Sequence, residues 1–167
     1  MKQYIGTKVV QAAPAVRYLM KDGNNMVIEK DDHLAMAQVN MDEVTGWEEA
    51  YLIVYKDGYS SWCPKKVFEE AYRQTDCMNF GLAIEAMKKG FRVARHGWNG
   101  KNMSVAYQKG YPEGIPCNKN TAEAWGMKEG ELFKCRPYMQ MRCADGTFQM
   151  WLASQSDILA DDWYIVD

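Results

Sequence analysis

Closely spaced turn signals constrain the fold of this chain more than any other feature of its sequence. Lys21-Asp22-Gly23-Asn24-Asn25 is a turn cluster, and the pairs Asp57-Gly58 and Asp145-Gly146 each lie between two short apolar runs. An Asp-Gly pair between apolar runs is typical of a β-hairpin, because both residues tolerate the positive φ angles of a tight turn. The sequence therefore predicts short antiparallel strands.

The apolar runs beside these turns are the expected strands. Residues 50–55 are expected to pair with a return strand that starts at 60–62, and residues 136–143 with 148–151. Single strands are expected at residues 3–11, 91–94, 103–107 and 163–166. Residues 16–20 fit either a short strand or a helix, and the Gly- and Pro-rich segment 110–118 is expected to be a loop.

Four short helices are expected between the strands, and each has a residue suited to a helix start: Pro64, Asn79, Asn120 and Ser154. Pro fits the first turn, where its missing N–H has no partner, and Asn and Ser side chains accept hydrogen bonds from free N–H groups. Ser154 with Asp157 three residues later has the spacing of a capping box. Short helices packed on small antiparallel sheets make an α+β fold.

The two halves of the chain differ in charge, and a small anionic ligand fits the second half better than the first. Residues 1–77 carry 9 Lys+Arg and 12 Asp+Glu, a net charge of −3, whereas residues 78–167 carry 11 and 10, a net charge of +1. The polar stretch 73–77 between them has the composition of a linker. We therefore expect a strand–hairpin–helix module at residues 1–76 and a second domain at residues 78–167.

The composition excludes several classes of function. The net charge of −2 argues against binding to a nucleic-acid polymer, which requires a basic surface. No apolar run reaches membrane-spanning length, and the N-terminal residues have no apolar core of signal-peptide length, so neither a membrane partner nor an export signal is expected. Five cysteines without a Cys-x-x-Cys motif, and only two histidines, indicate a cytoplasmic protein with reduced thiols, no metal site and no cofactor.

Two tryptophan-bearing turns in the second half suggest a ligand site. Arg95-His96-Gly97-Trp98-Asn99 and Trp151-Leu152-Ala153-Ser154-Gln155-Ser156-Asp157 each put a flat ring beside amides, hydroxyls and backbone N–H groups. Such a mixture suits a ligand with flat bases and polar sugars or phosphates, because aromatic faces stack on bases. The chain has no Walker loop, no G-x-G-x-x-G motif and no carboxylate cluster spaced for Mg²⁺, so we expect no catalytic residues.

Each candidate residue also has a purely structural interpretation. Three aromatic residues can line a pocket or pack in the core: Phe80, Trp98 and Trp151. Asp157 can contact a ligand or cap a helix, and it can do both. Arg95 can pair with a phosphate or with a nearby carboxylate, Asp161 or Asp162, and a surface ion pair is the default.

The second half resembles a known phage family. The resemblance rests on these parts of residues 78–167: Met78-Asn79-Phe80-Gly81-Leu82-Ala83-Ile84-Glu85-Ala86-Met87-Lys88-Lys89-Gly90, Val93-Ala94-Arg95, Gly97-Trp98-Asn99-Gly100, Pro137-Tyr138, Ala144-Asp145-Gly146, Trp151 and Ala153-Ser154-Gln155-Ser156-Asp157-Ile158-Leu159-Ala160-Asp161-Asp162-Trp163. They are similar to a phage and prophage domain that includes the second type of Thoeris anti-defence proteins. The family implies an α+β homotetramer with pockets shared between subunits.

That resemblance also implies a function and a set of site residues. Family members are non-enzymatic sponges that sequester glycocyclic ADP-ribose, the signal made by TIR-domain proteins, and some also take up cyclic dinucleotides. The implied partner is a cyclic nucleotide second messenger in the infected host cell. The expected ligand-binding residues are Phe80, Arg95, Trp98, Asn99, Trp151, Ser154, Gln155 and Asp157.

The first half resembles a different small phage module, for which no activity is implied. Its signature consists of Tyr4-Ile5-Gly6-Thr7-Lys8 and the run from Tyr55 to Tyr72. Its acidic charge leaves a second function open, in which the chain binds a host defence enzyme and inhibits it. A nucleotide-hydrolysing enzyme is the third alternative.

Overall fold

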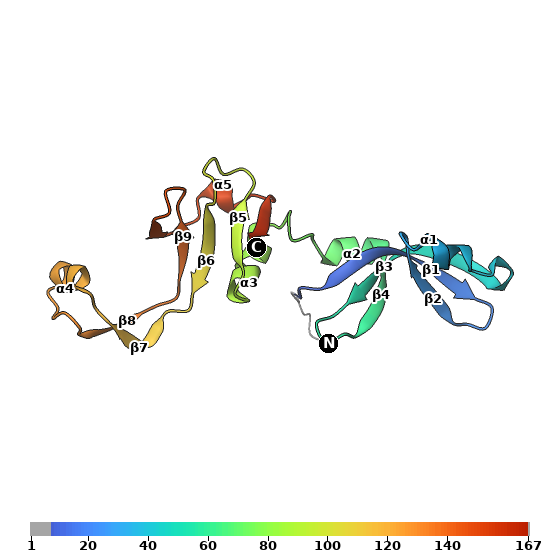
Figure 1. Cartoon of the computed structure of the whole chain (residues 1–167), viewed down its shortest axis with the longest axis horizontal. Coiled ribbons are helices and arrows are strands. Elements are labelled where there is room, and N and C mark those ends of the chain that lie inside the picture. The colour runs from blue at the N-terminus through green and yellow to red at the C-terminus, as the bar shows by residue number, and fades with distance from the viewer. Residues whose placement is uncertain (1–7, 167) are drawn as a thin grey trace. The chain divides into compact units, whose positions relative to one another are not determined.

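The computed structural model describes residues 8–166 and divides the chain into two compact units (Figure 1). The N-terminal unit is Met1–Arg73 and the C-terminal unit is Gln74–Asp167. Both units combine short helices with antiparallel sheets, so the predicted α+β fold is confirmed.

The N-terminal unit is built on a four-stranded antiparallel sheet in the order β2-β1-β3-β4. Its strands are β1 (Gln11–Met20), β2 (Asn25–Glu29), β3 (Val44–Val54) and β4 (Ser60–Pro64). Between β2 and β3 lie helix α1 (His33–Ala37) and the 3-10 turn η1 (Met41–Glu43), and helix α2 (Lys65–Ala71) follows β4. The predicted hairpin at Asp57-Gly58 is confirmed, and Gly58 has the expected positive φ of 83°.

The core of this unit lies between the sheet and its helices. Val16, Tyr18 and Ile28 are buried against residues of the α1 segment. On α2, the Phe68 ring stacks on Tyr51 of β3, with ring centroids 4.1 Å apart. Glu49 of β3 forms ion pairs with two lysines, and the hydrogen bonds from Lys30 and Lys65 lower its pKa to about 2.

The expected strand over residues 3–11 is wrong at residues 8–10. Residues 3–7 lie outside the described residues, and residues 8–10 have no strand structure. Strand β1 begins at Gln11 and runs through Pro14 to Met20, so the ambiguous segment 16–20 is a strand. Pro14 lies at the end of the β1–β2 pairing, which starts at Ala15, and its carbonyl oxygen accepts a hydrogen bond from the Lys30 N–H just beyond β2 at 2.8 Å. Proline is tolerated there because the regular ladder does not need its missing N–H.

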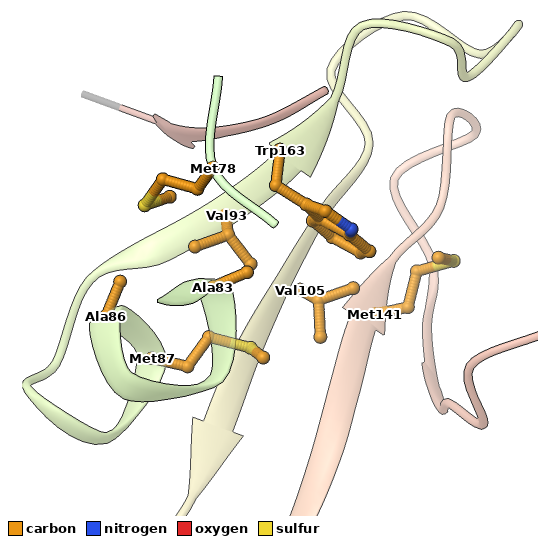
Figure 2. Close-up of a cluster of buried hydrophobic side chains, with 8 residues drawn as sticks. All are labelled: Met78, Ala83, Ala86, Met87, Val93, Val105, Met141 and Trp163. Atoms are coloured by element: carbon orange, nitrogen blue, oxygen red, sulfur yellow. The ribbon is translucent and has the colours of Figure 1, made fainter. Parts of the chain in front are cut away.

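The C-terminal unit contains a five-stranded antiparallel sheet in the order β10-β9-β6-β5-β11. The strands are β5 (Arg92–Arg95), β6 (Ser104–Gln108), β9 (Tyr138–Arg142), β10 (Phe148–Met150) and β11 (Trp163–Val166). Helix α3 (Phe80–Lys88) packs on one face, where its buried residues contact Val93, Val105 and Trp163 (Figure 2). Asn79 caps α3 as predicted, because its side chain accepts a hydrogen bond from the Leu82 N–H at 3.0 Å.

A two-stranded ribbon extends the pair β6–β9. Strands β7 (Tyr111–Pro116) and β8 (Leu132–Cys135) pair with each other and are joined through helix α4 (Lys119–Trp125) (Figure 1). The ribbon bends at Gly110, where a Cβ atom would lie 2.6 Å from the Cys135 carbonyl oxygen. The predicted loop at 110–118 is wrong, because most of this segment is strand β7. The bulged pairing with β8 accommodates Gly and Pro residues that a central strand excludes. Helix α4 is capped by Asn118 rather than by the expected Asn120.

The polar stretch between the modules is bonded to the C-terminal unit. The Thr75 carbonyl accepts a hydrogen bond from the Ile165 N–H at 3.0 Å, and Met78 pairs with Trp163. The His96 ring also contacts the Asp76 carbonyl oxygen at 3.1 Å. Residues 75–78 therefore lie alongside β11 and are hydrogen-bonded to that edge of the sheet.

Candidate ligand-binding site

Four aromatic rings pack against one another in the C-terminal unit. Phe80 is the first residue of α3, Trp98 lies in the turn after β5, Trp151 follows β10, and Trp163 begins β11. Trp163 is fully buried at the centre, with its ring centroid 5.4 Å from those of Phe80 and Trp98 and 6.0 Å from that of Trp151. The other three rings are partly buried and form the border between core and surface.

The geometry of the rings limits how a ligand can use them. The planes of Trp98 and Trp151 meet at 72°, with centroids 6.0 Å apart. Aromatic pairs favour such edge-to-face contacts, so the arrangement also stabilises the core. Two rings nearly at right angles form a corner, and a flat base can stack on only one of them at a time.

Asp157 lies beneath this corner and is only 8% exposed. Its Oδ1 accepts hydrogen bonds from Arg95 Nη1 at 2.8 Å and Trp98 Nε1 at 3.1 Å. Its Oδ2 accepts from the Ser154 N–H at 3.0 Å and the Ser154 hydroxyl at 2.6 Å. The Asp157 N–H donates in turn to Ser154 Oγ at 3.1 Å, which completes the predicted capping box of helix α5 (Gln155–Ile158). Burial alone raises the pKa of Asp157, but the hydrogen bonds from Ser154, Arg95 and Trp98 together lower it to about 2.

Arg95 is held between two carboxylates. Besides Asp157, it binds Asp162, with Nε donating to Oδ1 at 2.7 Å. The hydrogen bond to Asp162 is the main cause that raises the pKa of Arg95 and lowers that of the Asp162 carboxyl. Of the alternatives open from the sequence, the structure places Arg95 in ion pairs with Asp157 and Asp162 rather than with Asp161.

The turn that carries Trp98 is fixed by the same segment. The Gly97 N–H donates to Asp162 Oδ2 at 2.8 Å, and the His96 N–H donates to the Asp162 carbonyl at 3.2 Å. A Cβ atom on Gly97 would lie 2.9 Å from Asp162 Oδ2, so the carboxylate packs directly against the backbone of the turn. These contacts fix the position of the turn.

The structure brings together most of the residues expected at the site. Six of them form one connected cluster: Phe80, Arg95, Trp98, Trp151, Ser154 and Asp157. The side chains of Asn99 and Gln155 are exposed at its border. Because α5 has four residues and Ser154 with Asp157 caps it, its N-terminus offers little to an anion. Ligand binding by these eight residues stays a prediction.

Sequence interpretation missed Trp163 as part of this cluster and named Asp162 only as one possible partner of Arg95. Both become neighbours of the Trp98 turn because β11 pairs with β5 in a register that sets Trp163 opposite Arg95. The local sequence indicates only that a strand follows Asp162. Asp162 and Arg95 are 67 residues apart in the chain, and nothing in the sequence near either residue indicates that their strands pair. Within residues 8–166, no group of three His, Cys, Asp or Glu side chains could hold a metal ion, and no helix is long and apolar enough to cross a membrane.

Comparison with known proteins identifies the domain that carries this cluster. The family model of the Thoeris anti-defense 2-like domain, Tad2-like, matches residues 78–166. The chain belongs to the Tad2-like family. It is similar to Thoeris anti-defense 2 of Bacillus phage SP01, with 35% identity over 92 residues, which covers 53% of this chain and 94% of that protein. Membership in this family supports a function in countering Thoeris defence and confirms the family resemblance expected from the sequence.

Proposed function

We propose that this Tad2-like protein binds a cyclic nucleotide immune signal of the glycocyclic ADP-ribose class and sequesters it without cleaving it. The observation that carries the proposal is the corner of half-buried rings, Trp98 and Trp151, set on a rigid network of hydrogen bonds within the family domain. Aromatic faces bind bases without regard to their identity, and a rigid site loses little entropy on binding.

The ionisable groups at the cluster favour binding over catalysis. Arg95, Asp157 and Asp162 are engaged with one another, and the pKa of each is shifted toward its charged form. A general acid or base works best with a pKa near the operating pH, which these shifts move away from. The cluster therefore suits a stoichiometric sponge.

A sponge must bind tightly, and this requirement favours an assembly. Nanomolar affinity corresponds to about −12 kcal/mol, whereas one stacked base contributes about 1–3 kcal/mol. The C-terminal unit exposes several large apolar side chains on β10 and nearby segments, among them Phe148, Met150, Leu152 and Leu159. Apolar surface of this kind suits an interface between copies, and we propose that the chain is a homotetramer whose subunits close the site together.

The function is tested by incubating the protein with purified glycocyclic ADP-ribose, titrating the affinity by calorimetry, and then denaturing the complex by heat. The proposal predicts submicromolar binding and release of the intact nucleotide, as seen by chromatography and mass spectrometry. Release of a product would indicate an enzyme. Absence of binding at micromolar protein would contradict the proposal.

The N-terminal unit favours one alternative. It is acidic, and it exposes several large apolar side chains, among them Leu34 and Trp47. An acidic surface with exposed apolar side chains suits a protein partner, such as a host defence enzyme that the chain would inhibit. In the same incubation experiment, a chain that acts only in this way would leave all of the nucleotide free.

A further inference from the structure

We propose that Asp162, rather than Asp157, is the carboxylate that accepts a hydrogen bond from the bound nucleotide, from a ribose hydroxyl or from an N–H on a base edge. This inference rests on the proposed function and deepens it. It concerns which side chain of the cluster still has a hydrogen-bonding position available to a ligand.

The hydrogen-bonding capacity of Asp157 is already used. A carboxylate has about four acceptor positions, two on each oxygen. Asp157 Oδ1 accepts two hydrogen bonds, from Arg95 and Trp98, and Oδ2 accepts two from Ser154. Its side chain is only 11% exposed, so a ligand would have to displace a protein partner to reach it.

Asp162 keeps an available acceptor position. Its Oδ1 accepts one hydrogen bond, from Arg95 Nε, and its Oδ2 accepts the Gly97 N–H together with a long contact of 3.4 Å to Arg95 Nη2. Its side chain is 33% exposed, three times as much as that of Asp157. The carboxylate lies against the turn that presents Trp98, so a base stacked on that ring brings its sugar or edge near Asp162.

The charge around Asp162 selects the part of the ligand that faces it. Arg95 neutralises only one of the two carboxylates that it binds, so the three side chains carry a net charge of −1. A phosphate would be repelled from this position, whereas a hydroxyl or an amino group donates to it. The phosphates of the ligand must therefore point away from Asp162.

The test is a calorimetric titration of glycocyclic ADP-ribose into the full chain and its Asp162→Asn variant. Asn keeps the size of the side chain and an oxygen for the Gly97 N–H. The matched control is Asp161→Asn, which removes the same charge at the next residue, whose side chain is exposed. Because the ligand is an anion, loss of a nearby negative charge by itself strengthens binding.

The sign of the change therefore separates the two explanations. We expect Asp162→Asn to weaken binding at least tenfold and Asp161→Asn to leave it equal or slightly tighter. Binding by Asp162→Asn that is as tight as that of the control would overturn the inference. Failure of the wild-type chain to bind would instead contradict the proposed function, so the two failures are distinguishable.

Ligand analogues test whether Asp162 contacts the nucleotide directly. They are deoxyribose analogues and base analogues that lack the amino group. At least one analogue should bind the wild type about tenfold more weakly and lose nothing further in Asp162→Asn, because the two changes remove the same hydrogen bond. Equal losses in both proteins would mean that Asp162 only positions the turn, which would refute contact. If Asp162→Asn does not fold, the wild-type series decides alone, since binding that no analogue weakens excludes the contact.

Discussion

Removal of the Asp157 carboxylate is the most direct perturbation of the network beneath the tryptophan corner. In Asp157→Ala, Arg95 loses one of its two anions, the Trp98 indole N–H loses its acceptor, and α5 loses half of its capping box. Removing one partner of a largely buried ion pair costs about 3–5 kcal/mol. We expect the free energy of unfolding of the C-terminal unit to fall by about this amount, which includes about 1 kcal/mol for the cap.

The pKa of Asp157 gives a second estimate for the share that depends on its charge. Its folded-state pKa of about 2 lies below the ordinary value of 3.8. A difference of nearly two units corresponds to about 2 kcal/mol of stability. Because the folded pKa is the lower one, this stabilisation is complete above pH about 4 and is lost as the pH falls through about 2. In Asp157→Asn this part of the acid dependence should be missing.

The assay is urea unfolding of the wild type, Asp157→Ala, Asp157→Asn and the control Asp161→Ala at neutral pH, repeated between pH 2 and 5. In urea, the exposed control should stay within about 0.5 kcal/mol of the wild type. In a thermal melt of the same variants, a loss of about 3 kcal/mol lowers the Tm of a unit of this size by about 12–24 °C. The reasoning is refuted if Asp157→Ala unfolds like the control. It is also refuted if Asp157→Asn loses stability between pH 4 and 2 as steeply as the wild type.

Three further predictions follow from the cluster and the fold. Trp98→Ala and Trp151→Ala should each weaken nucleotide binding by about ten- to a hundredfold, because each removes a stacking face. Both should also lower the Tm, because both rings pack against Trp163. Normal affinity in folded Trp98→Ala would show that this ring belongs to the core alone. Light scattering at micromolar concentration should give the mass of a tetramer, and a monomer mass would contradict the shared site. A fragment of residues 74–167 should melt at a higher temperature than residues 78–167, because only the longer one keeps the Thr75 bond to Ile165; equal melting temperatures would show that this bond contributes nothing.

The parts of the fold that the sequence predicts correctly are those fixed by neighbouring residues. The Asp57-Gly58 and Asp145-Gly146 turns, the Asn79 cap and the capping box of Ser154 are each closed by hydrogen bonds between residues no more than four positions apart. The local backbone chemistry decides such features, so a single sequence contains what is needed to predict them.

The parts that the sequence misses depend on pairing between distant strands. The strand is expected to end at residue 11, yet β1 begins there and continues through Pro14, which lies at the end of its pairing with β2. The segment after Gly110 has loop composition, yet it pairs with residues 132–135 as the outer part of a ribbon. In both cases the tertiary partner overrides the local preference, because a hydrogen-bonded edge tolerates Pro and Gly that a central strand excludes.

The candidate site shows the same division. The cap formed by Asp157 follows from its spacing to Ser154, and the polar, tryptophan-bearing turns are visible along the chain. That Arg95 binds Asp157 and Asp162 depends on the pairing of β5 with β11, which also buries Trp163 beneath the turn. The sequence therefore predicts the residue types of the site, but the division between structural and available side chains requires the fold.

The side chains that the fold already occupies limit the affinity that one chain of the proposed sponge can reach. Within one chain, the corner of Trp98 and Trp151 stacks one base face, and Arg95 and Asp157 are occupied by each other. Stacking at about 1–3 kcal/mol and one hydrogen bond to a charged group at about 1.5–3 kcal/mol fall well short of the −12 kcal/mol of nanomolar binding. The contacts to the phosphates must then come from outside this cluster. A second copy can supply them, and it would also enclose the nucleotide away from its receptor. A variant that stays folded but is monomeric should therefore bind the nucleotide only weakly, even though every residue of the cluster is intact.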